Sequence, residues 1–255
     1  MFRKDDPREH PRSAEPPLRP WGEPQPGEPR PPLRPATGHN TRLLSIAFFI
    51  LMLALVGAHA YRGLSDPDAW DYWKDLYISP SLTSSIARDG DHRILAIRGV
   101  IGPAAADWFR NRLDSAELTA GDTVVLSSRG GDLDQAIIIG SIVRSRELTT
   151  AVGRLDADGA MQPSYCASAC VFIYAGGTVR KAVPGTRLGV HRGTIVGTGI
   201  DLAIETQRTE GLILRYMTRM GVSPALVEAM LATDEIRWLS IDEAMAMQLV
   251  TVAGQ

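Results

Sequence analysis

The chain has 255 residues, a formal net charge of −2 and 44% hydrophobic residues, which is ordinary for a globular protein of one or two domains. The near-neutral charge and the lack of a basic stripe with interleaved aromatic residues argue against a nucleic-acid-binding protein.

The first 42 residues differ sharply in composition from the rest. They contain eleven of the seventeen prolines and hardly any aliphatic side chains. Such a segment buries too little apolar surface to offset the entropy that ordering it would cost. Residues 1–42 are therefore predicted to be a disordered, proline-rich tail.

Residues 43–60 follow as an apolar segment with no Asp, Glu, Lys or Arg. This length is at the lower limit for spanning the hydrocarbon core of a membrane, and the absence of a polar face argues against a buried core helix. A signal peptide is the main alternative, because Ala58-His59-Ala60 fits a small-x-small cleavage site. The long segment before the apolar stretch favours an uncleaved transmembrane anchor. Both interpretations take the C-terminal part through the inner membrane.

The orientation follows from the distribution of Lys and Arg around the span. Arg30, Arg34 and Arg42 precede it, whereas Arg62 and Lys74 follow it among several aspartates. Because basic residues favour the cytoplasmic side, this bias predicts a single-pass inner-membrane protein with a periplasmic C-terminal domain.

Residues 61–90 are predicted to be a linker with a short amphipathic stretch at 70–76, and residues 91–255 to be a folded domain. In this domain short apolar segments alternate with helical patterns. Strands are expected at 93–98, 123–127, 148–152 and 187–191, and helices at 103–117, around 137–143, at 169–175, 201–220 and 224–231, before a final strand and helix at 237–246. This alternation predicts a layered α/β domain with a largely parallel sheet, in which functional loops gather at the carboxyl ends of strands.

Three segments at expected strand ends carry the chemistry. Ser168 lies in the small-residue turn Cys-Ala-Ser-Ala-Cys, at the start of an expected helix, where a hydroxyl can stand exposed beside free amides. A lone serine in such a place most often caps or packs a helix. The neighbouring segments favour a nucleophile instead, since a serine needs a base and an oxyanion site to react.

His191 directly follows an expected strand and is the candidate general base, whereas His92 precedes one and is expected to be structural. Gly130-Gly131 follow another strand and can present a bare backbone amide. The N–H groups of Gly131 and Ala169 are thus the candidate oxyanion donors, and the set indicates acyl transfer, most simply peptide hydrolysis.

The chain has only two cysteines, Cys166 and Cys170, on either side of Ser168. A helical turn between them would allow a disulfide that stiffens the serine turn in an oxidising compartment. Two small buried residues are an equally good interpretation. The sequence indicates no metal site and no cofactor, because no further Cys or His stands at ligand spacing.

The order Ser-x-Gly-Gly, small-Ser-small and Arg-x-x-x-His resembles the Clp protease peptidase of the Clp/crotonase superfamily, over residues 93–252. The stretch Arg237-Trp-Leu-Ser-Ile-Asp-Glu-Ala is similar to the C-terminal segment of that family. The single anchor and the two cysteines are more similar still to uncharacterised membrane-anchored, periplasmic Clp-like proteins. This resemblance implies Ser168 as nucleophile, His191 as base and Gly131 and Ala169 as oxyanion donors.

Two positions depart from the family pattern. Arg129 stands where the family has proline, and Ile236 stands where it has the third catalytic residue, an aspartate. Asp234 or Glu235 is the nearest substitute, and Asp234 is the candidate of choice. Without an orienting acid the site is a Ser-His dyad or is inactive.

The predicted function is a membrane-anchored serine peptidase that acts on peptides or unfolded proteins, and self-association is expected by resemblance. A peptide-binding module without turnover is the alternative. Crotonase-type acyl-CoA chemistry would use the same amides, but an exported compartment offers little acyl-CoA.

Overall fold

The computed structural model describes residues 39–65, 67–193 and 199–253. The chain divides into two units, residues 1–56 and 57–255. Most of the expected tail, residues 1–38, lies outside the described residues, so its predicted disorder stays a prediction.

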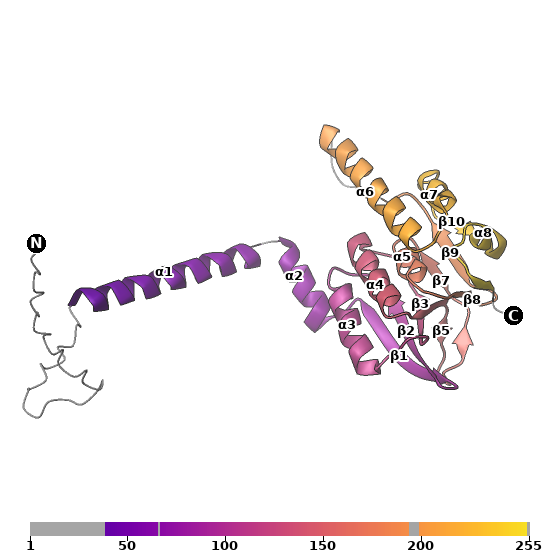
Figure 1. Ribbon diagram of the computed structural model, residues 1–255, viewed down its shortest axis with the longest axis horizontal. Helices are drawn as coiled ribbons and strands as arrows, with labels where there is room; N and C mark the ends of the chain where they lie inside the picture. Colours follow the sequence, from indigo (N-terminus) through magenta and orange to yellow (C-terminus); the bar gives the residue numbers. More distant parts are fainter. Residues whose placement is uncertain (1–38, 66, 194–198, 254–255) are drawn as a thin grey trace, which may run out of the picture. The chain divides into compact units, whose positions relative to one another are not determined.

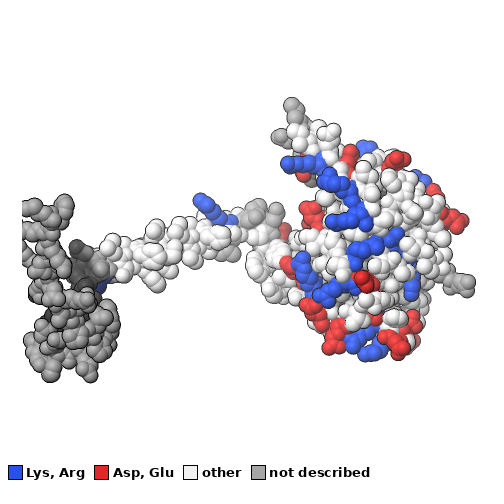
Figure 2. Space-filling model, in the orientation of Figure 1, with Lys and Arg blue, Asp and Glu red and all other residues white. Residues whose placement is uncertain are grey.

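The first described element is one long apolar helix, α1 (His39–Leu64). Its stretch Arg42–Gly63 has a mean hydropathy of 2.4, and none of it is buried against protein. Twenty-two residues of helix measure about 33 Å, close to the thickness of a hydrocarbon core. Figure 2 shows this helix free of charged side chains for most of its length. Among the described residues, it is the one helix long and apolar enough to cross a membrane.

The C-terminal unit contains a six-stranded sheet of order β1-β2-β3-β4-β8-β11. β1 (Leu82–Asp89) pairs antiparallel with β2 (His92–Gly99), and every other pair in the sheet is parallel. The remaining strands are β3 (Thr123–Ser127), β4 (Thr149–Val152), β8 (Arg180–Ala182) and β11 (Val252–Ala253). The expected α/β domain with a mainly parallel sheet is confirmed.

The two faces of this sheet are covered differently. The helices α3 (Ala105–Ala116), α4 (Leu133–Ser145) and α5 (Cys170–Ala175) lie on one face (Figure 1), where they enclose the main core. On the other face Ile94, Ala96, Val125 and Ala151 pack under the hairpin of β5 (Arg154–Leu155) and β6 (Met161–Gln162). Successive residues of β2 and β3 therefore enter different cores, as the two-residue period of a strand requires.

A second, three-stranded sheet has the order β10-β9-β7. β7 (Tyr165–Ala167) runs parallel to β9 (Arg187–Val190), and β10 (Arg237–Leu239) is antiparallel to β9. The helices α6 (Gly199–Arg219), α7 (Pro224–Leu231) and α8 (Ile241–Ala246) complete the unit. An isolated bridge between Ser128 and Cys166 joins the two sheets next to the serine turn.

The structure departs from expectation over residues 61–90. The short amphipathic stretch expected at 70–76 lies in α2 (Pro67–Trp73) and the π-helix η1 (Lys74–Ile78), and the strand β1 occupies residues that were expected to be linker. The folded unit therefore begins before residue 91. β1 is an edge strand with mostly exposed, polar side chains, so its sequence lacks the apolar run that identified the other strands.

Candidate active site

Ser168 lies between the end of β7 and the start of α5. Its φ of 56° is left-handed, a conformation that a residue with a side chain rarely adopts. Its N–H donates to the carbonyl of Gly189 at 3.0 Å, which fixes the turn to the neighbouring strand β9. A sharp strand–serine–helix turn of this kind presents the hydroxyl while the main chain stays packed below it.

A disulfide encloses this turn. Cys166 and Cys170 are joined with 5.3 Å between their Cα atoms, and both side chains are fully buried. Of the two interpretations that the sequence leaves open, the structure therefore has the bridged one. The bond ties the last strand residues to the first turn of α5, so the conformation of Ser168 is held from both sides.

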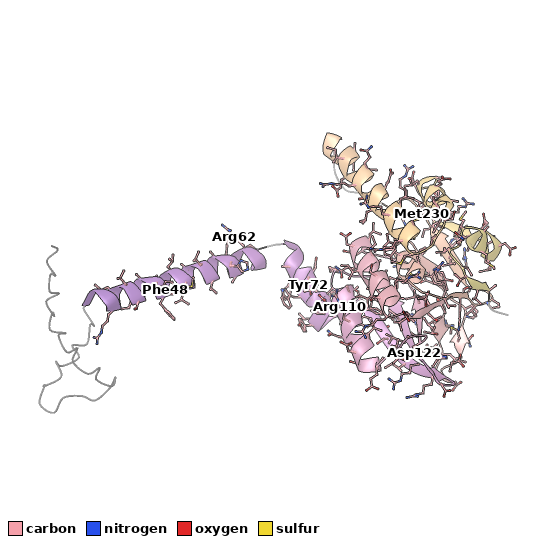
Figure 3. The ribbon with its side chains drawn as sticks, viewed as in Figure 1. Phe48, Arg62, Tyr72, Arg110, Asp122 and Met230 are labelled. Atoms are coloured by element: carbon pink, nitrogen blue, oxygen red, sulfur yellow. A yellow bond between two sulfur atoms is a disulfide. The ribbon has the colours of Figure 1, made fainter. Side chains whose placement is uncertain are left out.

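His191 follows the last residue of β9. Because β7 and β9 are parallel neighbours, with Ala167 opposite Gly189, the residues just after the two strands emerge side by side. The Nε2 atom of His191 lies 2.8 Å from Oγ of Ser168, at hydrogen-bond distance. His92, by contrast, begins β2, and its ring lies 3.5 Å from Asp122. Figure 3 shows Asp122 at the opposite end of the domain from Met230, which lines the cavity beside Ser168.

The glycine pair follows β3 and packs against the serine turn. Gly130 and Gly131 have φ values of 106° and 141°, which suit glycine alone. A Cβ atom on Gly131 would stand 2.2 Å from the carbonyl oxygen of Ile101, so the loop has no room for a side chain. Asp132 then caps α4 by accepting a hydrogen bond from Gln135 N at 2.9 Å.

The N–H groups of Gly131 and Ala169 have no hydrogen-bond acceptor among the residues that the structure describes. Both residues line the same cavity as Ser168 and His191. Free amides at this place are suited to bind a negatively charged oxygen, and the N-terminus of a helix adds to the effect. The structure thus brings four of the predicted site residues together.

Asp234 does not join them. Its carboxylate lies 3.8 Å from Arg192 in an ion pair, and 87% of the aspartate side chain is exposed. Among the described residues, no carboxylate oxygen lies within 4.0 Å of a ring nitrogen of His191. The expectation that Asp234 orients the imidazole is therefore wrong for this conformation, because solvent and Arg192 hold the side chain elsewhere. Ile236 packs beside Gly189 of β9, where it offers no polar atom.

The cavity beside Ser168 has a volume of about 880 Å³. Its floor and walls combine apolar side chains from α5, α6 and α7 with charged groups at the rim; they include Phe172, Leu212, Ile213, Met230, Asp134, Glu205, Arg208 and Arg215. The sequence analysis expected a helix at 201–220 but assigned none of its residues to the site. The apolar stripe of this helix does not distinguish a cavity-lining face from a core-facing one, because both have the same pattern.

Among the residues that the structure describes, no group of three or more His, Cys, Asp or Glu side chains is arranged to hold a metal ion.

Comparison with known proteins places the fold. No protein-family model matches the chain, and no curated protein matches it in sequence. The structure is similar to that of ClpP1 from Listeria monocytogenes, with a TM-score of 0.50 and 21% identity over 64% of this chain and 91% of that chain. A point mutant of ClpP1 from the same organism gives a TM-score of 0.51 and 23% identity, over 65% of this chain and 92% of that one. The chain therefore has a Clp protease-like fold.

Proposed function

We propose that this protein is a membrane-anchored serine peptidase with Ser168 as nucleophile and His191 as general base. The observation that carries the proposal is the 2.8 Å distance between His191 Nε2 and Ser168 Oγ, next to two free backbone amides.

In the proposed reaction, His191 Nε2 takes the proton of Ser168 while Oγ attacks the carbonyl carbon of a peptide bond. The N–H groups of Gly131 and Ala169 bind the oxygen that becomes negative, an interaction worth roughly 10²–10³-fold in rate per donor. The protonated imidazole then gives its proton to the leaving amine, and water hydrolyses the acyl-enzyme by the same route. General-base catalysis contributes roughly a further 10²–10⁴-fold.

The substrate in this proposal is a peptide or an unfolded segment. Ser168 is only partly exposed at the wall of the cavity, so the scissile bond must reach it in an extended chain. The apolar part of the lining accepts a hydrophobic side chain, and the charged rim can bind the polar main chain and termini.

A fluorophosphonate probe on the full chain in detergent tests the nucleophile. We expect labelling of the wild type and at least a hundredfold slower labelling of Ser168→Ala and His191→Ala. Labelling that persists in Ser168→Ala would place the nucleophile elsewhere.

The second candidate function is a peptide-binding module without turnover. It is favoured by the lack of a carboxylate at His191 within the described part of the chain. In that case peptides would bind in the cavity with the same affinity in the wild type and in His191→Ala, and no hydrolysis would be detected in either.

The anchor in the proposal is α1, with the peptidase unit on the periplasmic side. Reporter fusions after Gln255 test this side: an alkaline phosphatase fusion should be active and a green fluorescent protein fusion exported by the same route should be dark. The reverse pattern would place the unit in the cytoplasm.

Self-association belongs to the same proposal and is tested by mass photometry of the protein in detergent. A single species with the mass of one chain would refute it.

A further inference from the structure

An exposed aromatic surface lies on the segment formed by α2 and η1. It consists of Trp70, Trp73, Tyr77 and Ile78, whose exposed fractions are 65%, 46%, 71% and 64%. The rings of Trp73 and Tyr77 stack with 5.6 Å between their centroids. The spacing of Trp70, Trp73 and Tyr77 places the three rings on one side of the segment. We call these four residues the aromatic face.

The opposite side of the same segment is docked on the folded unit. The hydroxyl of Tyr72 donates to Asp107 of α3 at 2.5 Å, and Arg110 binds the same carboxylate. Figure 3 labels Tyr72 and Arg110 where α2 meets α3. The hydrogen bond to Asp107 raises the pKa of Tyr72 to about 12, because the hydroxyl donates to a carboxylate. The segment is thus fixed by one side, and the aromatic face remains uncovered by the described residues of its own unit.

Asp75 anchors the segment a second time. The carboxylate is buried and accepts hydrogen bonds from the N–H groups of Ser81 at 2.7 Å and Ala104 at 3.1 Å. Leu76 packs against the main core. These contacts make the segment a rigid part of the unit rather than a free tether, so whatever binds the aromatic face also orients the unit.

The chemistry of the aromatic face fits the interfacial region of a bilayer. Tryptophan and tyrosine combine a large apolar ring with a polar tip, and they concentrate where hydrocarbon meets water. Two charged residues of the segment, Asp71 and Lys74, are exposed and can remain in water beside the rings. A soluble monomer seldom leaves such rings together in solvent.

Chain connectivity points to the same partner. The apolar stretch of α1 ends at Gly63, and only Ser65 and Asp66 separate α1 from α2 in the sequence. Three peptide steps span at most about 11 Å. If α1 crosses a membrane, α2 must begin within that distance of the point where the helix leaves it.

We propose that the aromatic face inserts into the lipid interface and holds the peptidase unit in one orientation at the membrane surface. This inference rests on the anchoring part of the proposed function and does not depend on hydrolysis. The lipid bilayer is the occupant, and a second copy of the chain is the alternative that the experiment below rejects.

The test is quenching of tryptophan emission by brominated lipids in proteoliposomes that contain the full chain with Trp21→Phe. Phosphatidylcholine brominated at the 6,7 position of one acyl chain is compared with the unbrominated lipid. We expect quenching in this parent protein, and also when Trp238→Phe is added to it as a control. When Trp70 and Trp73 of the parent are both changed to phenylalanine, the quenched fraction should be at least twofold smaller. Bromine at the 11,12 position should quench less, because the rings lie near the headgroups.

Three results would overturn the inference. The first is an equal quenched fraction in the parent and in Trp70→Phe/Trp73→Phe, in a protein that resists extraction by alkaline carbonate. This result would support the anchor but not the insertion of the aromatic face. The second is the absence of lipid quenching in the parent together with loss of self-association in the same double variant. This result would show that the aromatic face binds a second copy of the chain. The third is extraction of the protein by carbonate, which would refute the membrane anchor and, with it, the insertion of the aromatic face.

Discussion

Gly130 lies directly against Ser168: a Cβ atom on this glycine would stand 2.7 Å from Cβ of the serine. The same position would be 2.8 Å from the carbonyl oxygen of Ala167 and 2.9 Å from the amide of Ala169. The glycine loop and the serine turn are therefore in direct contact. The loop can approach this closely only because Gly130 has no side chain.

Replacing Gly130 by alanine should disable the site. The new methyl group meets the main chain of the serine turn, and a φ of 106° is strained for alanine. We expect fluorophosphonate labelling to fall at least a hundredfold. Gly121→Ala is the control: its φ of 88° imposes comparable strain, but its Cβ would meet only His92 at 3.5 Å. Equal labelling of the two variants would contradict the packing argument.

Asp234→Ala should leave peptidase activity within about twofold of the wild type. Its carboxylate is bound to Arg192 and is not within 4.0 Å of His191. His191→Ala should lose roughly 10³-fold or more in kcat, since it removes the proposed base. Steady-state hydrolysis of a fluorogenic peptide measures both. A loss in Asp234→Ala that approaches that of His191→Ala would show that the aspartate turns in during catalysis.

The sequence predicted those helices and strands that a short stretch of apolar and polar residues is enough to identify. Strands such as β3 and β9 are short, largely apolar runs that a polar residue follows, and the ends of these two strands lead to Gly131 and His191. Ser168 follows β7, which lies beside β9 in the three-stranded sheet. The alternation of strands with helices was enough to infer an α/β domain with a largely parallel sheet, but not that β7, β9 and β10 form a sheet of their own.

Contacts set by side-chain packing were not predictable in the same way. β1 pairs along its whole length with β2, yet its polar, exposed residues look like linker in the sequence. The direction of the Asp234 side chain depends on Arg192, a neighbour in space that spacing alone does not identify. The disulfide remained one of two alternatives because burial of Cys166 and Cys170 is compatible with either state.

Breaking the disulfide should weaken both stability and activity. The bond holds the turn that keeps Ser168 in its left-handed conformation, and a short closed loop of this kind stabilises by about 2 kcal/mol. Cys166→Ser/Cys170→Ser should lower the melting temperature and slow fluorophosphonate labelling about tenfold or more. Because both sulfurs are buried, a mild reductant should act on the native protein slowly. Unchanged labelling in the double variant would mean that packing alone fixes the turn.

Asp75→Ala should reduce turnover although the residue is remote from Ser168. Its carboxylate holds the segment around Ala104, and in the same segment Ile101 donates to Gly130 O at 2.9 Å and accepts from Asp132 N at 2.8 Å. Loss of this support lets the glycine loop shift, which should lower kcat about tenfold while KM changes less. Asp71→Ala is the control, because Asp71 lies on α2, close in sequence to Asp75, and its side chain is exposed. A pure change in melting temperature, with kcat intact, would refute a positioning role.

Asp122→Asn should remove a pH-dependent part of the stability. Burial alone would raise the pKa of Asp122, but hydrogen bonds from the N–H groups of Thr119 and Arg93 outweigh it and lower the pKa below its usual value. The charged form is thus favoured by folding, so its contribution is present above about pH 4, the unfolded pKa, and is lost as the pH falls through the folded pKa.

At pH 7 we expect Asp122→Asn to destabilise the protein by about 1–3 kcal/mol, because the amide cannot accept every hydrogen bond that the carboxylate accepts. The difference from wild type should shrink as the pH is lowered from 5 to about 2.5. Thermal unfolding in detergent, followed by circular dichroism across this range, measures it. Asp91→Asn, at an exposed position in the β1–β2 turn, is the control substitution. A gap between wild type and Asp122→Asn that stays constant with pH would show that the side chain acts through its shape and not its charge.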